Sequence, residues 1–204
     1  MSTHPHKYKN STGATMPAFG IFRLATAARE STQELVPTAE LVEFDNSMPL
    51  FVNSAKSVSD NAYGNCRSVL ESPFWVRYDT GNAPANGDIV GPVDGETFVS
   101  EKGDGFLVLF KDTTKELVWC ALIDQTRIWD AELTASMSAA SNSKTGASSA
   151  TAKLLVPDPS SAGNLMDGPT ITVKNRSLDS TGLSGDYIQV VRIGNEWRPV
   201  WIDC

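Results

Sequence analysis

The sequence predicts an all-β protein, and three observations support this fold class. With 15 Gly and 11 Pro among 204 residues, turn-forming residues divide the chain into short segments. Those segments are rich in Val, Ile, Phe, Trp and Thr, which favour strands. The C-terminus also carries the pattern of a tight β-hairpin. We expect a barrel or sandwich-like N-terminal domain followed by a small C-terminal β module.

The expected strands follow the apolar segments in chain order. Each is bounded by Gly, Pro, Asn, Asp or Ser, the residues that form turns. Residues 26–35 are the one segment that could form a helix, and that helix would be short. The strands are expected at 19–25, 41–44, 67–70, 74–78, 97–101, 105–111, 116–123, 154–156, 171–176, 187–193 and 196–202.

The most specific local signal is the hairpin at the C-terminus, where the last two of these segments flank Gly194-Asn195. A Gly at the first central position suits a type II′ turn, whose twist matches that of paired strands. Alternation along the last strand places Trp197 and Trp201 on one face. Pro199 has no backbone N–H to donate, so we expect this strand to lie at an edge or to carry a bulge.

Residues 131–152 differ in composition from the rest of the chain. They hold no aromatic residue, and 16 of the 22 are Ala, Ser or Thr, so little apolar area offsets the cost of ordering them. Residues 1–130 carry 11 Lys and Arg against 17 Asp and Glu, whereas 153–204 carry 5 against 6. We therefore expect a flexible tail at 1–9, a β domain at 10–130, a linker or surface excursion at 131–152 and a β module at 153–204.

The charge and the hydropathy pattern argue against two classes of partner. A net charge of -7 offers no basic face to neutralise phosphates, which predicts no direct nucleic-acid binding. The longest apolar runs, Phe106–Phe110 and Leu117–Ile123, are far shorter than the roughly 20 residues that a bilayer requires, which predicts no membrane insertion. The first ten residues are polar and resemble no signal peptide, so we expect synthesis in a cytoplasm without export.

The residues that usually carry catalysis are sparse. The two histidines, His4 and His6, fall in the expected tail, which leaves no histidine for a catalytic triad or a zinc site. Cys66, Cys120 and Cys204 are too widely and irregularly spaced for a disulfide framework, and we expect them reduced. No phosphate-binding glycine loop occurs. The sequence thus predicts a protein that is not an enzyme, with no catalytic, cofactor-binding or metal-binding residues.

A few motifs have both a functional and a plain structural interpretation. Asp79-Thr80-Gly81 matches the D-T-G of aspartic proteases, but its polar surroundings favour a strand ending in a turn. Acidic loops such as Asp94-Gly95-Glu96 lack the ligand spacing of a calcium loop. The sequons at Asn10 and Asn175 would need export to be glycosylated. Tryptophans 75, 119, 129 and 201 could stack on sugars, although a core role is the simpler interpretation.

Several turn-and-strand motifs resemble virion proteins of tailed bacteriophages and prophages. The opening at 10–21, NSTGATMPAFGI, is similar to the N-x-S-G-x-x-I-P-x-y-G start of that group. Later segments are similar to the same proteins: Ala83–Asp88 with Gly91-Pro92, Gly105–Leu109, and the terminal Gly185–Tyr187 and Gly194–Trp197. The resemblance covers about half the chain and carries no catalytic residue. It departs from the group chiefly at 131–152.

This resemblance implies a structural subunit of a phage particle, with a tail, fibre-attachment or baseplate position first and head decoration second. The expected partners are other virion subunits and further copies of the chain, and the expected location is the virion. A carbohydrate-binding or carbohydrate-hydrolysing module acting on the host surface is the alternative of a different class, because 24 Asp and Glu leave room for a catalytic carboxylate pair.

Overall fold

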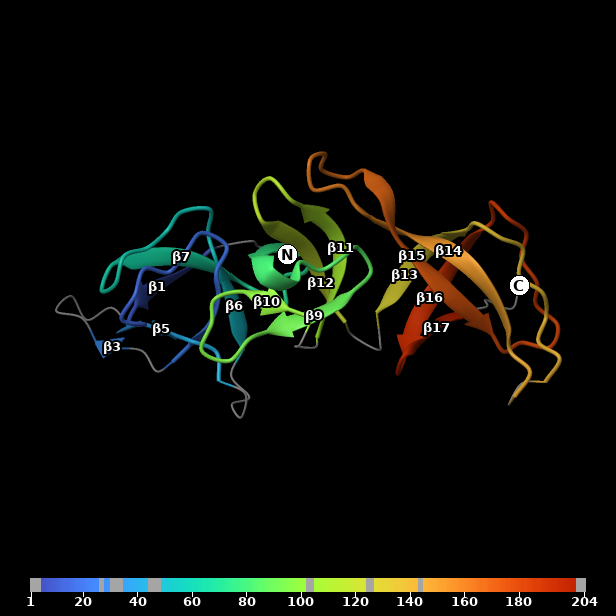
Figure 1. Ribbon diagram of the computed structural model, residues 1–204, viewed down its shortest axis with the longest axis horizontal. Coiled ribbons are helices and arrows are strands. Elements are labelled where there is room, and N and C mark those ends of the chain that lie inside the picture. Colours follow the sequence, from blue (N-terminus) through green and yellow to red (C-terminus); the bar gives the residue numbers. More distant parts are fainter. Residues whose placement is uncertain are drawn as a thin grey trace. The chain divides into compact units, whose positions relative to one another are not determined.

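The computed structural model shows an all-β protein (Figure 1), as the sequence predicts. Every regular element among the described residues is a strand, apart from the single 3-10 turn η1 (Thr80–Asn82). The chain divides into two compact units, residues 1–122 and residues 123–204. The structure describes residues 5–25, 28–29, 35–43, 49–101, 105–123, 127–142 and 145–200.

The N-terminal unit begins with a closed five-stranded barrel. In order around the barrel its strands are β1 (His6–Asn10), β5 (Thr38–Glu40), β2 (Ile21–Leu24), β6 (Leu50–Asn53) and β7 (Tyr63–Ser68). The β1–β5 pair is parallel and the other pairs are antiparallel. Tyr8 and Phe22 pack inside, with ring centroids 4.6 Å apart.

The prediction of a flexible tail at 1–9 is wrong for its described part, because β1 is a barrel strand from His6 onward. Tyr8 is fully buried, whereas of its two neighbours Lys7 is exposed and Lys9 is partly buried. One aromatic residue between two lysines is too weak a pattern to indicate a strand. Pairing with β5 and β7 on both sides supplies the stability that the local sequence lacks.

A five-stranded sheet completes the N-terminal unit. Its strands, in order, are β10 (Val99–Ser100), β9 (Ile89–Pro92), β11 (Phe106–Asp112), β12 (Leu117–Leu122) and β8 (Phe74–Arg77). One face of this sheet forms a core with Ile21 and Val52 from the barrel. The segments expected as strands at 74–78, 105–111 and 116–123 are therefore confirmed, within a residue or two at their ends.

The helix expected at 26–35 does not form in the described part of that segment. β3 (Ala28–Arg29) pairs with β4 (Leu35–Val36) in an antiparallel ribbon, so the described residues are extended. The strand expected at 41–44 is also wrong for its described residues, 41–43, which form no ladder. Local propensity is a weak guide for segments this short, because pairing partners decide their conformation.

The C-terminal unit is a second closed five-stranded barrel. Its strands, in order around the barrel, are β13 (Ile128–Leu133), β14 (Ser148–Pro157), β15 (Leu165–Asn175), β17 (Glu196–Pro199) and β16 (Tyr187–Ile193). β13, β14 and β15 follow one another as hairpins, and β16 returns beside β13, which is a Greek key. β17 closes the barrel between β16 and β15.

The linker or surface excursion predicted at 131–152 is wrong where the segment forms strands, because residues 131–133 belong to β13 and residues 148–152 to β14 of the second barrel. The segment holds the end of β13, the start of β14 and the connection between them, and the unit boundary falls at residue 122 rather than 130. Ala150 and Ala152 are buried, whereas Ser149 and Thr151, which alternate with them along the strand, are exposed. A barrel of only five strands has a narrow interior, which alanine fits without large apolar side chains.

The C-terminal hairpin forms as predicted, with Ile193 opposite Glu196 and Gly194 at a φ of 59°. The expectation of an edge strand or a bulge at Pro199 is wrong, because β17 has neighbours on both sides and its register with β16 is regular through Pro199. Pro199 is tolerated because, among the described residues, β17 and β15 share one residue pair, Val173 with Trp197. Trp201 lies outside the described residues, so its predicted position beside Trp197 stays a prediction.

The two barrels share one strand arrangement with different starting points. Among the described strands, each contains a single parallel pair, β1–β5 in the first and β15–β17 in the second. Read around the barrel from that pair, β1-β5-β2-β6-β7 corresponds to β15-β17-β16-β13-β14. Along the chain, the second barrel therefore starts at the strand that corresponds to β6. It is a circular permutation of the first.

A buried asparagine ends the corresponding strand in each barrel. In the first barrel it is Asn10, the last residue of β1, which is fully buried. Its Nδ2 donates to the carbonyl oxygens of Ala14 at 2.7 Å and Val58 at 2.9 Å. Its Oδ1 accepts from the backbone N–H of Thr12 at 3.2 Å. The side chain ties the loop after β1 to the connection between β6 and β7.

Asn175, the last residue of β15, makes the same set of contacts in the second barrel. Its Nδ2 donates to the carbonyl oxygens of Ser138 at 2.9 Å and Ser180 at 2.7 Å, and its Oδ1 accepts from the N–H of Ser177 at 2.9 Å. Ser138 lies between β13 and β14, the strands that correspond to β6 and β7. The two asparagines are thus equivalent positions of the repeated architecture.

Candidate interaction surface

The outer face of the C-terminal barrel exposes several large apolar side chains. The exposed fractions are 73% for Tyr187, 56% for Leu165, 52% for Ile128 and 45% for Ile193. Side chains alternate along a strand, so every second residue of these strands faces outward and its neighbours point into the barrel. Leu155 on β14 is partly buried beside them. We call these five residues the outer apolar face.

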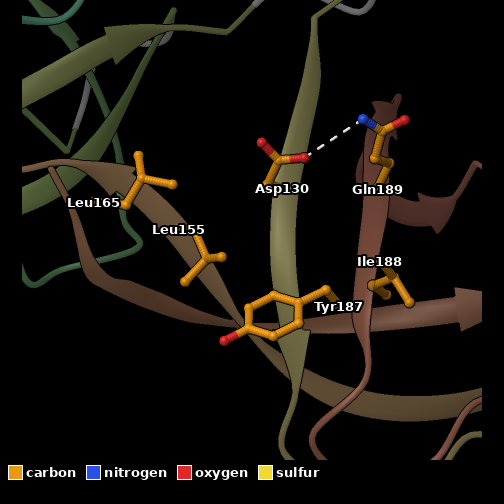
Figure 2. Close-up of a pocket in the computed structure, with 6 residues that line it drawn as sticks. All are labelled: Asp130, Leu155, Leu165, Tyr187, Ile188 and Gln189. Atoms are coloured by element: carbon orange, nitrogen blue, oxygen red, sulfur yellow. Dashed lines mark hydrogen bonds between the residues drawn. The ribbon is translucent and has the colours of Figure 1, made fainter. Parts of the chain in front are cut away.

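A hollow of about 340 Å³ lies in this face (Figure 2). Its walls come from four strands, β13, β14, β15 and β16. Asp130 and Gln189 lie side by side on neighbouring strands, and Gln189 Nε2 donates to Asp130 Oδ1 at 3.4 Å. The lining residues are Asp130, Leu155, Leu165, Tyr187, Ile188 and Gln189. The hollow suits an apolar group with a polar or cationic neighbour, since its walls are apolar and its one charge is negative.

The surroundings of the hollow are acidic. Asp130 lines it, and Glu132 follows two residues later on the same side of β13. Asp167 lies opposite Leu155 in the β14–β15 ladder, and Lys153 Nζ donates to its carboxylate at 2.6 Å. This bond and the charge of Asp167 raise the pKa of Lys153, so the lysine stays charged. Three carboxylates against one ammonium form what we call the acidic rim.

The opposite end of β16 is basic. Glu196 lies opposite Ile193 and is surrounded by three cations. Its carboxylate oxygens accept from Lys174 Nζ at 2.9 Å, from Arg176 Nη2 at 3.1 Å and from Arg198 Nη2 at 3.1 Å. The bond from Lys174 and those from the two arginines lower the pKa of Glu196 to about 2. We call these four residues the basic cluster, which carries two net positive charges.

A second partly exposed group, the aromatic row, lies on the five-stranded sheet of the N-terminal unit. Trp75, Trp119 and Phe110 occupy facing positions on β8, β12 and β11. The ring centroids of Trp75 are 5.2 Å from Trp119 and 6.2 Å from Phe110. Arg77, also on β8, forms an ion pair at 3.3 Å with Glu116, which directly precedes β12. Two of the tryptophans weighed for sugar stacking are therefore brought together.

The other tryptophans weighed for sugar stacking are not part of this row. Trp129 is 5% exposed and contacts Trp197 edge-on, with centroids 6.3 Å apart. The guanidinium of Arg127 covers its ring at 4.2 Å from the centroid. Trp129 therefore has a core role, as the simpler interpretation has it. Trp201 lies outside the described residues.

Asp79 of the D-T-G motif caps the 3-10 turn that follows β8. Its Oδ1 accepts from the N–H of Gly81 at 2.9 Å, and its Oδ2 accepts from Asn82 Nδ2 at 2.8 Å. Both carboxylate oxygens are engaged within the turn itself. This geometry supports the interpretation of a strand ending in a turn.

The histidine and cysteine positions differ in part from those expected. His6 lies in β1 rather than in a tail, with its Nε2 3.9 Å from Glu71 and its ring against Phe51. Cys66 and Cys120 are buried free thiols, and burial raises both pKa values, that of Cys66 to about 12. Neither is a thiolate at neutral pH. His4 and Cys204 lie outside the described residues.

The asparagines of the two sequons, Asn10 and Asn175, are buried and hydrogen-bonded inside the fold. The amide nitrogens of Asn10 and Asn175 each donate to two carbonyl groups inside the fold, an arrangement the sequence did not indicate. Within the described residues, no group of three or more His, Cys, Asp or Glu is placed to hold a metal ion. No helix in that part of the chain is long and apolar enough to cross a membrane.

Comparison with protein families, with curated proteins and with solved structures finds no match. The site therefore has to be interpreted from its own geometry. The sequence did not indicate the outer apolar face. In the run Tyr187–Ile193, apolar residues occupy both odd and even positions. The strand alternation therefore does not show which residues face outward.

Proposed function

We propose that the chain is a non-enzymatic structural subunit of a bacteriophage particle, in the tail, its fibre attachment or its baseplate. Its location is then the virion, after synthesis in the host cytoplasm, and its partners are other virion subunits and copies of itself. The observation that carries this proposal is the outer apolar face with its hollow. The choice of a bacteriophage particle rests on the resemblance of the turn-and-strand motifs to phage virion proteins.

The outer apolar face supports a subunit contact on physical grounds. Tyr187 and Leu165 are more than half exposed and lie beside the same hollow. Contiguous apolar surface of this kind marks an interaction site, because its exposure to water costs about 25 cal/mol per Å². Acidic and basic groups at its two ends suit a contact with defined orientation.

The test is incorporation into particles. The double variant Leu165→Ser/Tyr187→Ser and a control, Leu183→Ser, are produced during infection in a host that lacks the wild-type chain. Leu183 is 68% exposed in the connection between β15 and β16 and does not line the hollow. We expect the double variant to lose at least about tenfold in copies per particle, as truncating a central interface aromatic costs about 2 kcal/mol. The control keeps its copy number.

Absence of the wild-type chain from purified particles contradicts the proposal. Where it is present, electron microscopy with a tagged chain separates tail positions from head decoration, the nearer alternative. A double variant that incorporates as well as Leu183→Ser shows that particle contacts lie elsewhere.

A carbohydrate-binding or carbohydrate-hydrolysing module is the second candidate, and the aromatic row favours it. Aromatic faces stack on sugar rings, and Trp75 and Trp119 lie next to each other with an ion pair nearby. Five-stranded Greek-key barrels of the OB-fold kind also bind oligosaccharides, although this is an analogy of fold alone. The test is binding to host surface polysaccharide by the wild-type chain and by Trp75→Ala, with sugar release measured in parallel.

A further inference from the structure

We propose that the outer apolar face of the C-terminal barrel is a self-association surface that receives a second copy of this chain. In this contact the basic cluster of one copy lies against the acidic rim of the other. The inference deepens the proposed function, on whose contact face it rests, by naming the partner of that face, and its test on the purified chain needs no particle.

The first argument is charge complementarity within one barrel. The acidic rim combines Asp130, Glu132 and Asp167 with one lysine, which leaves two net negative charges. The basic cluster combines Lys174, Arg176 and Arg198 with Glu196, which leaves two net positive charges. Opposite charges of equal size on two patches of one chain allow the patches of two identical copies to attract each other. A contact between two like patches would instead be repulsive.

The second argument is the distance between the patches. Tyr187, at the acidic rim, and Ile193, at the basic cluster, lie at opposite ends of β16. Six residues along a strand span about 20 Å. Ion pairs form at about 4 Å or less, so the basic cluster of one barrel cannot neutralise its own acidic rim. Only a contact between two copies can therefore bring a basic cluster to an acidic rim.

The third argument is the apolar surface between the charges. Ile193 is exposed next to the basic cluster, and Leu155, Leu165 and Tyr187 surround the hollow next to the acidic rim. When the basic cluster of one copy lies at the acidic rim of the other, Ile193 beside that cluster comes close to the hollow beside that rim. An apolar centre with charged ends is the usual composition of a specific contact. A twofold contact of this kind closes a dimer, and a head-to-tail contact between the same two patches builds a larger assembly.

The experiment exchanges the charges of one patch at a time in the full chain. The rim variant is Asp130→Lys/Glu132→Lys, and the cluster variant is Lys174→Glu/Arg198→Glu with Glu196→Gln, which avoids three adjacent carboxylates. Each variant alone has two patches of like sign. Mixed together, they offer opposite signs at both contacts. Association is measured by analytical ultracentrifugation over a concentration series, and folding by circular dichroism and thermal melting.

We expect the wild-type chain to form a dimer or a larger assembly. Each variant alone dissociates at least about tenfold more readily, and the equimolar mixture regains association. The wild-type affinity also falls as salt rises from 50 mM to 500 mM, because the ion pairs are screened. The control Lys56→Glu, an exposed lysine of the N-terminal unit, associates like wild type.

Recovery in the mixture also guards against misfolding, because a variant that fails to fold cannot restore the contact. A wild-type chain that stays monomeric at high micromolar concentration overturns the inference, whether or not it enters particles. Variants that associate as wild type does overturn it as well. Failure of incorporation into particles, by contrast, contradicts only the proposed function.

Discussion

Replacing Asn175 by Ala tests whether the buried asparagines hold each barrel together. The substitution removes both donations from Nδ2, to the carbonyl groups of Ser138 and Ser180, and the acceptor for the N–H of Ser177. An unsatisfied buried polar group costs about 1 to 3 kcal/mol, and water reaches part of this site because the serines are not fully buried. We therefore expect a loss of about 2 to 4 kcal/mol in the free energy of unfolding, a large share of the roughly 5 to 15 kcal/mol of a typical domain.

The measurement is urea unfolding at pH 7, followed by tryptophan fluorescence and by circular dichroism. Asn175→Asp keeps the Oδ1 acceptor but loses both donations, so it should be at least as unstable as Asn175→Ala. The matched control is Asn164→Ala, an exposed asparagine of the same unit, which should change stability by less than about 0.5 kcal/mol. An Asn175→Ala protein within that same limit would refute the reasoning, because it would show that the bridge between the two connections is dispensable.

Four further predictions concern single positions. Because the pKa of Glu196 is lowered from 4.5 to about 2, its ion pairs stabilise the fold fully above pH 4.5 and are lost as the pH falls through 2; acid unfolding of Glu196→Gln should lack this component. The thiol of Cys66, with its pKa raised to about 12, should react with a thiol reagent at pH 8 only after denaturation, and rapid labelling of the native chain would contradict its burial. Gly64→Ala places a Cβ 2.7 Å from the Tyr8 ring and should cost about 1 to 3 kcal/mol in thermal melting, whereas an unchanged midpoint would mean that the ring can move. Asp79→Asn keeps an acceptor for the turn and should leave folding and particle incorporation intact, so a peptidase activity lost with this variant would show that the D-T-G motif is catalytic after all.

The hairpin and the linker show where local sequence is informative and where it is not. Gly194-Asn195 specifies its turn through backbone conformation, a property of two residues that needs no distant partner. Residues 131–152 were expected outside the fold because apolar side chains are scarce there. At residues 149–152, buried Ala alternates with exposed Ser and Thr, as in a strand. Alanine is large enough for these buried positions only because a five-stranded barrel has a narrow interior.

The same limit applies to the N-terminal strand and to the candidate surface. β1 has only Tyr8 as a large apolar residue, and it becomes a strand because β5 and β7 accept its backbone hydrogen bonds. The acidic rim and the basic cluster are each assembled from strands far apart in sequence, such as Glu132 with Asp167. No spacing rule within the chain brings these residues to one place.

The sequence by itself determined the all-β class, the C-terminal turn and the burial of Cys120, because turn chemistry and β-branched or apolar runs act within a few residues. Only the tertiary structure decided that there are two barrels, that the second is a circular permutation of the first, and that Ile128, Leu165 and Tyr187 face outward. Strand order, register and the side that faces solvent depend on pairings between distant segments. Those pairings are selected by the packing of the whole barrel rather than by any local pattern.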